Sequence, residues 1–347
     1  MLTVPNFGLW YDFRYSCNTS VSREQSYKDH LEHIIAAEAL GFDSIWLTEH
    51  HFQTDGYTPS PLVIAAAIGA ATKRLRIGTN LALLPLYDPV RLAEDAATLS
   101  LLTEGRFDLG VGAGYVEREY AVFGRNLKHR PSLMEEGISI IRQAWSGQPV
   151  NLKGKRFTVN ELMVRPIPER PPRLLMGAVA PVAIERAARL ADGFLDSGGI
   201  GQDHYLQSLA AAGQRSDQAA IFCGCWDIVC EAPERARTEL GPCLLRQMRS
   251  YQSMGAFPGS IIQTAEQAIE LGFYRFLTPE QMSDAVYQQV CRYPQTKDIH
   301  FWGRFPGEHA ASALRRVELL SRSVLPDVRQ KLQAVPSGLL GPNQTAS

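Results

Sequence analysis

The sequence predicts an α/β fold, a (β/α)8 TIM-like barrel with one insertion after the fourth βα unit. Eight short apolar segments alternate with segments whose apolar residues follow helical spacing, and the strand precedes the helix in each unit. The third strand, Arg76–Pro85, is almost wholly apolar, as expected for a strand buried on both faces. A length of 347 residues suits a single α/β barrel. A doubly wound open sheet would show the same order of elements and stays open as the alternative.

The elements follow one another in a regular order. The expected strands are Asn6–Phe13, Phe42–Phe52, Arg76–Pro85, Phe107–Tyr115 (the strand with its loop), Leu174–Met176, Gly193–Ser197, Ala219–Val229 and Asp298–Gly303. The expected helices are Ser22–Leu40, Pro61–Ala71, Asp88–Gly105, Ser132–Ser146, Pro181–Ala191, Ala232–Tyr251, Thr278–Cys291 and His309–Leu332. Ser22 followed by Gln25 is typical of a capping box, and Pro61 is typical of a first helical residue.

Two segments depart from this rhythm. Gln148–Arg173 is rich in proline and arginine with short β-like pieces, and we interpret it as the insertion; Gly255–Leu277 is merely irregular. Residues 1–334 are therefore expected to form one barrel domain. The last residues, 335–347, are expected to be a disordered tail.

Composition indicates an ordinary globular protein, with 45% hydrophobic and 20% charged residues and a net charge of -1. This charge gives no reason to expect nucleic acid or an anionic membrane as a partner. No apolar run approaches the roughly 18 residues of a membrane span, and no secretion signal is evident at the N-terminus. Six cysteines without a CxxC pair or zinc-like spacing favour a reducing, cytoplasmic location and no metal site.

The second expected strand ends in three titratable residues, Glu49, His50 and His51. The period of two sends Thr48 and His50 to one side and Glu49 and His51 to the other. A solvated strand end would explain this pattern, and so would a catalytic His50 at an active-site mouth. Three consecutive strand residues rarely converge on one metal ion, so a metal site is disfavoured.

Two further stretches lie where strands end. Gly110, Gly112 and Gly114 have the spacing GxGxG, which argues against a dinucleotide fingerprint. They indicate either tight packing of a neighbour or a flat ligand against the backbone. Gly177–Ala180 joins a strand to a helix that begins near Pro181, and its small residues could form a phosphate cradle or an ordinary turn.

Taken together, GFDSIWLTEHHF (Gly41–Phe52) and LPLYDPVRLAED and GRFDLGVGAGY within Arg76–Gly124 resemble the bacterial luciferase-like flavin-dependent monooxygenases in register. The resemblance continues through RAARLADGF (Arg186–Phe194) to SVLPDV (Ser323–Val328) and is weakest between Gly198 and Gly272. It implies a barrel that uses reduced FMN and O₂ to oxygenate a small, apolar organic substrate. A separate flavin reductase and a homodimer are implied as well.

The resemblance also implies site residues. His50 matches the first histidine of the family's EHH motif, which acts beside the flavin and its peroxide. A non-proline cis peptide next to the flavin is expected near Asn80–Leu81. The residues expected to bind the cofactor are Glu49, Asn80, Leu81, Gly112, Ala113, Gly114, Tyr115, Gly177, Ala178, Val179 and Ala180. The aromatic residues Trp10, Tyr11, Phe13, Tyr57, Tyr115 and Trp302 lie near strand ends and could line the substrate pocket or belong to the core.

The sequence departs from the luciferase pattern at the flavin phosphate. Ala113 stands where luciferase has an arginine, Gly112 where it has a cysteine, and Val179 or Ala180 where a serine is usual. Three functions therefore stay open. The first is the FMN monooxygenase, and the second is an F420-dependent hydride-transfer oxidoreductase of the same superfamily. The third is a flavin-binding barrel without turnover.

Overall fold

The computed structural model describes residues 2–15, 21–271 and 274–334, and the predicted tail lies outside them. Eight parallel strands of this part close into a barrel, because each pairs with the next in sequence and the last pairs with the first. They are β1 (Asn6–Tyr11), β2 (Ser44–Leu47), β3 (Arg76–Thr79), β5 (Phe107–Gly112), β8 (Arg173–Gly177), β9 (Gly193–Ser197), β10 (Ile221–Cys225) and β13 (Thr296–Trp302). The predicted (β/α)8 barrel is confirmed, and the open-sheet alternative is wrong.

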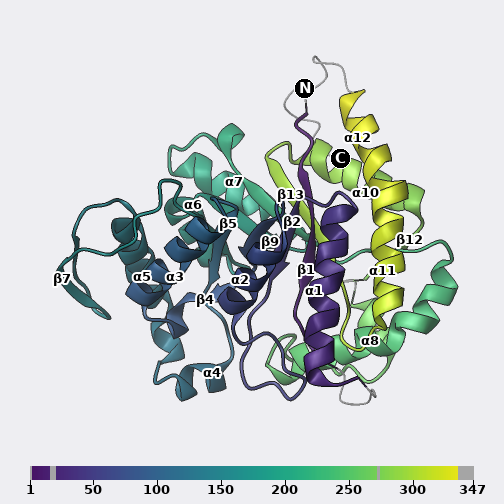
Figure 1. Ribbon diagram of the computed structural model, residues 1–347, viewed down its shortest axis with the longest axis horizontal. Coiled ribbons are helices and arrows are strands. Elements are labelled where there is room, and N and C mark those ends of the chain that lie inside the picture. The colour runs from purple at the N-terminus through teal and green to yellow at the C-terminus, as the bar shows by residue number, and fades with distance from the viewer. Residues whose placement is uncertain (1, 16–20, 272–273, 335–347) are drawn as a thin grey trace.

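Helices surround the strands (Figure 1). The longer ones are α1 (Arg23–Ala39), α2 (Pro61–Ala71), α3 (Pro89–Leu102), α5 (Arg130–Trp145), α6 (Pro181–Leu190), α7 (Gln202–Ala211), α8 (Pro233–Ser253), α10 (Pro279–Arg292), α11 (Ala310–Leu319) and α12 (Leu325–Gln333). A π-helical turn, Leu320–Val324, joins the last two. Caps start several helices as expected: the Asp88 carboxylate accepts from the backbone N–H groups of Val90 and Arg91 at the start of α3.

The insertion after the fourth βα unit is an antiparallel hairpin of β6 (Val150–Lys153) and β7 (Thr158–Leu162). It lies outside the barrel, at the edge of the molecule in Figure 1. A second excursion follows β10, where β11 (Ile228–Val229) pairs with β12 (Phe276–Leu277). This pair brackets α8 and the short helix α9 (Ala265–Glu270). The seventh predicted strand, Ala219–Val229, is therefore two strands, only the first of which belongs to the barrel.

Alternation along the strands separates two cores. Leu9 and Tyr11 of β1 and Leu47 of β2 belong to the core between the barrel wall and the helices. Trp10 and Trp46, which alternate with them, belong to the core that contains the inside of the barrel. The barrel is thus a packed core with its functional end at the carboxyl ends of the strands.

Several predicted strands end earlier than expected, and two of them end at breaks that shape the barrel mouth. β2 stops at Leu47, because the backbone N–H of His50 bonds to Thr58 O in the following loop and leaves the strand ladder. The third strand is interrupted at Asn80–Leu81, and only Ala82–Leu83 (β4) resumes pairing with β5. Both breaks place side chains at the mouth of the barrel.

Three helices were not predicted: α4 (Glu117–Val122), α7 and α9. The capping box expected at Ser22 is half formed: Ser22 Oγ accepts from Gln25 N–H, but the Gln25 amide bonds to Asp29 instead. In the described residues, no helix combines the length and the apolar character that crossing a bilayer requires.

Candidate active site

His50 is held at the barrel mouth by a buried carboxylate. Its Nδ1 lies 3.0 Å from Oε1 of Glu119, and the backbone N–H of His51 donates to the same oxygen at 2.8 Å. Glu119 belongs to α4, directly after β5, and is 1% exposed. A carboxylate accepts only, so Nδ1 carries the proton and Nε2 presents its lone pair. The described residues provide no hydrogen-bond partner for Nε2.

Glu49 and His51 form a separate brace. His51 Nε2 lies 2.8 Å from Glu49 Oε1, which also accepts from the Tyr87 hydroxyl at 3.0 Å. The other oxygen of Glu49 accepts from the backbone N–H of Leu83 at 2.9 Å. The predicted alternation is therefore confirmed, since Glu49 and His51 face away from His50. The carboxylate expected to touch the cofactor is engaged within the protein and ties β2 to the segment after β3.

The expected non-proline cis peptide is present at Asn80–Leu81. The Leu81 side chain lies over two strand ends: a Cβ added at Gly112 would be 2.4 Å from it, and one at Gly177 would be 2.5 Å from it. Gly112 and Gly177 thus make room for the Leu81 side chain, as the packing alternative for these glycines expects. Gly114 has φ +68°, a conformation that favours glycine.

Asn80 joins a polar network inside the barrel. Its amide donates to Nε2 of His300 at 2.8 Å, and His300 Nδ1 lies 3.0 Å from Asp298. Asp298 also accepts from the Trp46 indole at 3.0 Å and from the Ser44 hydroxyl at 2.5 Å. All these groups are buried. The network fixes Asn80, and with it the start of the segment that carries Leu81.

The remaining predicted cofactor residues meet at neighbouring strand ends. β5 and β8 pair in register, so Ala113 follows one strand beside Ala178, which follows the other. Both are partly exposed, whereas Val179 is 70% exposed. Ala180 is the N-cap of α6 and offers no side-chain cap. Pro181 has no N–H, and Ala183 N–H donates to Ala180 O at 2.9 Å, so in the first turn the N–H of Val182 is left for an anion.

Aromatic rings surround His50. The rings of Tyr57, Tyr115 and Tyr251 lie with centroids 4.8, 5.5 and 6.4 Å from the imidazole centroid, and each is steeply inclined to it. The hydroxyls of Tyr57 and Tyr251 lie 3.2 Å apart. Burial raises the pKa of Tyr115 and Tyr251, so these phenols stay neutral. Tyr251 is contributed by α8.

A buried cation lies beneath two of these rings. The Arg14 guanidinium is 4.1 Å from the Tyr57 ring centroid and 5.2 Å from that of Tyr251. It pairs with Asp12 at 3.0 Å and Asp55 at 3.4 Å, and its side chain is 0% exposed. Burial raises the pKa of Asp12 to about 6, although Arg14 opposes the shift. The cluster of Arg14, Asp12 and Asp55 thus supports the rings of Tyr57 and Tyr251.

A third group of aromatics lies across the mouth. Trp10 and Trp302 stack with ring centroids 4.6 Å apart, and Trp226 packs edge-on against both at 5.7 and 5.4 Å. The indole N–H groups of Trp10 and Trp302 are buried and have no acceptor among the described residues. Of the aromatics considered from the sequence, Tyr11 and Phe13 point into the outer core instead.

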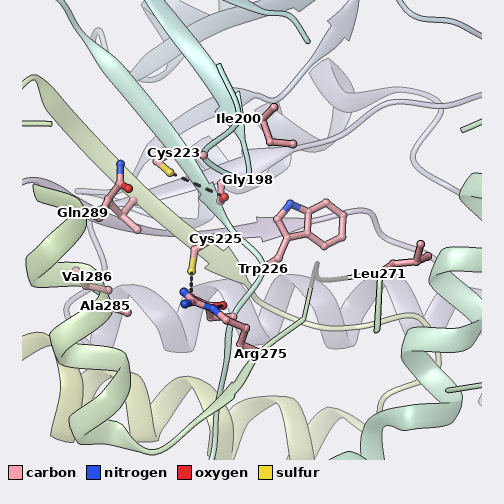
Figure 2. A pocket seen from close by; sticks show the side chains of 14 residues that line it. Gly198, Ile200, Cys223, Cys225, Trp226, Leu271, Arg275, Ala285, Val286 and Gln289 are labelled. Carbon is pink, nitrogen blue, oxygen red and sulfur yellow. Dashed lines mark hydrogen bonds and ion pairs between the residues drawn. The ribbon is translucent and has the colours of Figure 1, made fainter. Parts of the chain in front are cut away.

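A cavity of about 490 Å³ lies away from His50, between β10 and α10. Figure 2 shows Cys223, Cys225 and Trp226 lining it from the strand side, with Val286 and Gln289 opposite. None of the predicted site residues lines it. Arg275 at its edge is bound to Asp227 by two hydrogen bonds, at 2.7 and 2.6 Å. Among the described residues no cluster of histidine, cysteine or acidic side chains could hold a metal ion.

The sequence identified His50 but missed its partners. Glu119 follows GAGY by four residues, and a carboxylate in a short helix after a strand gives little signal. Arg14 directly follows a predicted strand and reads as an ordinary surface charge. Tyr251 comes from the stretch where the family resemblance is weakest, so no motif marked it.

A strand-end histidine held by a carboxylate, at the mouth of an α/β barrel, is the arrangement of a barrel enzyme. A family model described as luciferase-like monooxygenase matches residues 6–291. The chain belongs to this luciferase-like family, which confirms the resemblance, and it is an oxidoreductase of that family.

The names of similar proteins and structures include both F420 and FMN. An F420-dependent glucose-6-phosphate dehydrogenase of Amycolatopsis mediterranei is 35% identical over 201 residues, covering 56% of this chain and 60% of the relative. The chain thus matches less than two thirds of that relative's length. The monooxygenase RslO1 of Streptomyces bottropensis has a TM-score of 0.79 at 23% identity, covering 92% and 99% of the two chains. An F420-dependent secondary alcohol dehydrogenase has a TM-score of 0.73 at 19% identity, covering 94% and 100%. Both structures share the fold.

The mouth suits a flat, acceptor-rich ring with an anionic tail. Buried indole N–H groups without acceptors could meet ring carbonyls, and the uncapped start of α6 could meet the anion. Ala113 and Ala178 have small side chains, so they leave the backbone accessible between the indole N–H groups and the start of α6. The residues present therefore fit a flavin or a deazaflavin.

Proposed function

We propose that the protein is an F420-dependent oxidoreductase that oxidises an alcohol to a carbonyl compound by hydride transfer. The observation that carries the proposal is the contact between Glu119 and Nδ1 of His50. It fixes the tautomer in which Nε2 is a proton acceptor, which is what loss of an alcohol proton requires. The curated relatives support this choice of cofactor over the FMN chemistry that the sequence favoured.

Several groups of this chain would hold the deazaflavin. Leu81 would lie against its ring, and the backbone of Ala113–Gly114 and Ala178–Ala180 would line its edge and its tail. The deazaflavin supplies a two-electron acceptor for the hydride and does not need O₂.

His50 and the tyrosines perform the remaining chemistry. As the hydride leaves the carbinol carbon, the hydroxyl proton passes to Nε2 of His50, and the C–O bond becomes a C=O bond. The nearby carboxylate of Glu119 stabilises the imidazolium that forms. Tyr57, which is 3% exposed, and Tyr251 exclude water from this proton. The proton is later released to solvent.

An FMN-dependent monooxygenase is the second candidate, and the EHHF motif (Glu49–Phe52) favours it. Fed by a reductase, such an enzyme would need reduced FMN and O₂ at the same mouth. Ala113 weakens this candidate, because it replaces the arginine that luciferase uses for the flavin phosphate. A charge-assisted contact of that kind contributes roughly 1.5–3 kcal/mol. The predicted reductase belongs to this candidate, and the predicted homodimer stays a proposal under either.

Anaerobic titration separates the two candidates. The protein is titrated with oxidised F420 and oxidised FMN in calorimetry, and then mixed with the bound cofactor and a panel of alcohols. We expect tighter binding of F420 and alcohol-dependent loss of its visible absorbance. Reduced FMN followed by O₂ should give no flavin adduct in the absorbance spectrum. Adduct formation, together with inert F420, would replace the proposal by the monooxygenase.

A further inference from the structure

We propose that the substrate is an uncharged alcohol with an aromatic or bulky apolar group, and that Tyr251 determines this preference. The inference rests on the proposed function. The curated relative is named for glucose 6-phosphate, a sugar phosphate, and the proposed substrate differs from it. The mouth of this barrel has apolar walls. Among the described groups that contact these walls, no cation is accessible to a phosphate.

The walls around His50 are aromatic and apolar. Tyr57 and Tyr251 form a cluster with Val116 and Met254, and Tyr115 adds a ring that is 38% exposed. The three tyrosine rings present faces and edges to the imidazole at centroid distances of 4.8 to 6.4 Å. A planar apolar group gains edge-to-face contacts in such a space. A sugar would lose water from its hydroxyls and find few partners.

The charge at the mouth argues against a phosphate. Arg14 is the cation that contacts these rings in the described part of the chain. It lies between two carboxylates, Asp12 and Asp55, and is completely covered, so a substrate would have to displace Tyr57 or Tyr251 to reach it. Two carboxylates beside one guanidinium repel a further anion.

Other cations near the mouth are engaged elsewhere. The guanidinium of Arg118 lies 6.0 Å from the ring of Phe52, which packs against His51 and not against His50. Across the barrel, Arg275 is held by Asp227 through two hydrogen bonds. A phosphate at Arg275 would therefore have to break an ion pair, and one at Arg118 would lie over Phe52, on the His51 side of this segment.

Tyr251 joins the two groups of aromatic rings at the mouth. It comes from α8, in the excursion between β11 and β12, and links the two sides of the mouth. Its ring is 6.2 Å from Trp226 and 6.3 Å from Tyr57. Its hydroxyl bonds only to Tyr57 among the described residues, so the ring face is its means of selecting a substrate.

The test compares three probes: 1-phenylethanol, 2-propanol and glucose 6-phosphate. F420 reduction gives kcat/KM for each, and saturation-transfer NMR detects binding without turnover. For the wild type we expect kcat/KM to be about tenfold or more higher for 1-phenylethanol than for 2-propanol, and no reaction with glucose 6-phosphate. Turnover of glucose 6-phosphate in preference to 1-phenylethanol would overturn the inference and leave the proposed function standing.

Variants of Tyr251 and Tyr115 test which side chains determine the substrate preference. Tyr251→Ala should reduce the ratio of kcat/KM between 1-phenylethanol and 2-propanol about tenfold, and Tyr251→Phe should preserve it. Tyr115→Ala, at an exposed position, should lower the ratio as well and serves if Tyr251→Ala does not fold. Tyr287→Ala on α10 is the control and should leave the ratio of kcat/KM between 1-phenylethanol and 2-propanol unchanged. An unchanged ratio in both alanine variants at the mouth would overturn the role of these rings.

The two proposals fail differently. If 1-phenylethanol binds to the wild type and loses its NMR signal with Tyr251→Ala, the substrate class is supported even when F420 is not reduced. Binding of 1-phenylethanol without reduction of F420 would overturn the proposed function and leave the proposed substrate class standing.

Discussion

At the scale of single residues, Glu119 decides which nitrogen of His50 faces the substrate. Glu119→Gln preserves the size of the side chain and removes its charge. We expect kcat for alcohol oxidation to fall about tenfold or more, because the imidazolium loses its stabilising carboxylate. The pH–rate profile of the variant is measured beside that of the wild type. A profile identical to that of the wild type would show that Glu119 only fills space.

The brace on the other face of the EHHF segment makes a different prediction. Glu49 has a side chain that is 0% exposed, and His51 is one of its three partners. His51→Ala should lower the free energy of unfolding by about 1–3 kcal/mol, because a buried carboxylate loses a hydrogen bond. Urea denaturation measures this loss. His129→Ala, which removes a histidine without side-chain hydrogen bonds in the described residues, is the control and should stay near the wild type.

What the sequence could predict at this scale follows from local rules. The period of two correctly separated His50 from Glu49 and His51, because alternation depends only on neighbouring residues. The partners of His50 could not be predicted, since Glu119 is 69 residues away and Tyr251 about 200. Only the closed barrel brings them together. Leu81 over Gly112 is a similar case: the glycine pattern indicated close packing but not its partner.

At the scale of elements, Glu136 anchors the inserted hairpin to α5. Its carboxylate accepts from the backbone N–H groups of Lys155, Arg156 and Phe157 at 2.9 to 3.0 Å. Glu136→Ala should therefore increase amide hydrogen exchange in residues 150–162 while the barrel strands stay protected. Glu135→Gln is a matched control, because that carboxylate pairs with Arg186 and Arg189 and not with the hairpin. Uniform loss of protection over the whole chain would contradict the assignment.

Elements with strong local signals were predicted well. Pro61–Ala71 and Gly193–Ser197 agree with the structure residue for residue, since proline starts the helix and glycine starts the short strand. The short helices α4 and α9 have only six residues each, too few for a helical period to emerge. β11 was merged with β10, because an apolar run does not reveal that its end pairs with β12 outside the barrel.

At the scale of the whole molecule, buried neutral histidines make stability depend on pH. Burial lowers the pKa of His30 to about 3 and that of His33 to about 4. Their ordinary value is about 6.5, so the unfolded chain binds protons below that pH while the folded chain does not. Stability is therefore full above about pH 6.5 and declines as the pH falls towards 4. Asp12 acts oppositely, because its raised pKa favours the folded state below about 6.

The histidines outweigh Asp12, so we expect a net loss of roughly 2–3 kcal/mol in the free energy of unfolding between pH 7 and pH 5. His30→Gln cannot titrate and can still donate to Ser26 O, which His30 Nδ1 contacts at 2.7 Å. This variant should lose most of the pH dependence, because the remaining contributions of His33 and Asp12 nearly offset each other. Equal slopes for variant and wild type in urea denaturation would mean that other groups control acid stability.

The most direct test of the account follows one hydride and one proton. The protein, loaded with F420 without O₂, is mixed in a stopped-flow instrument with its best alcohol, unlabelled or deuterated at the carbinol carbon. We predict a primary isotope effect on loss of the F420 absorbance, and a rate that falls about 10²- to 10⁴-fold in His50→Gln. A wild-type rate in His50→Gln, with the isotope effect intact, would contradict the assignment of His50 as the base.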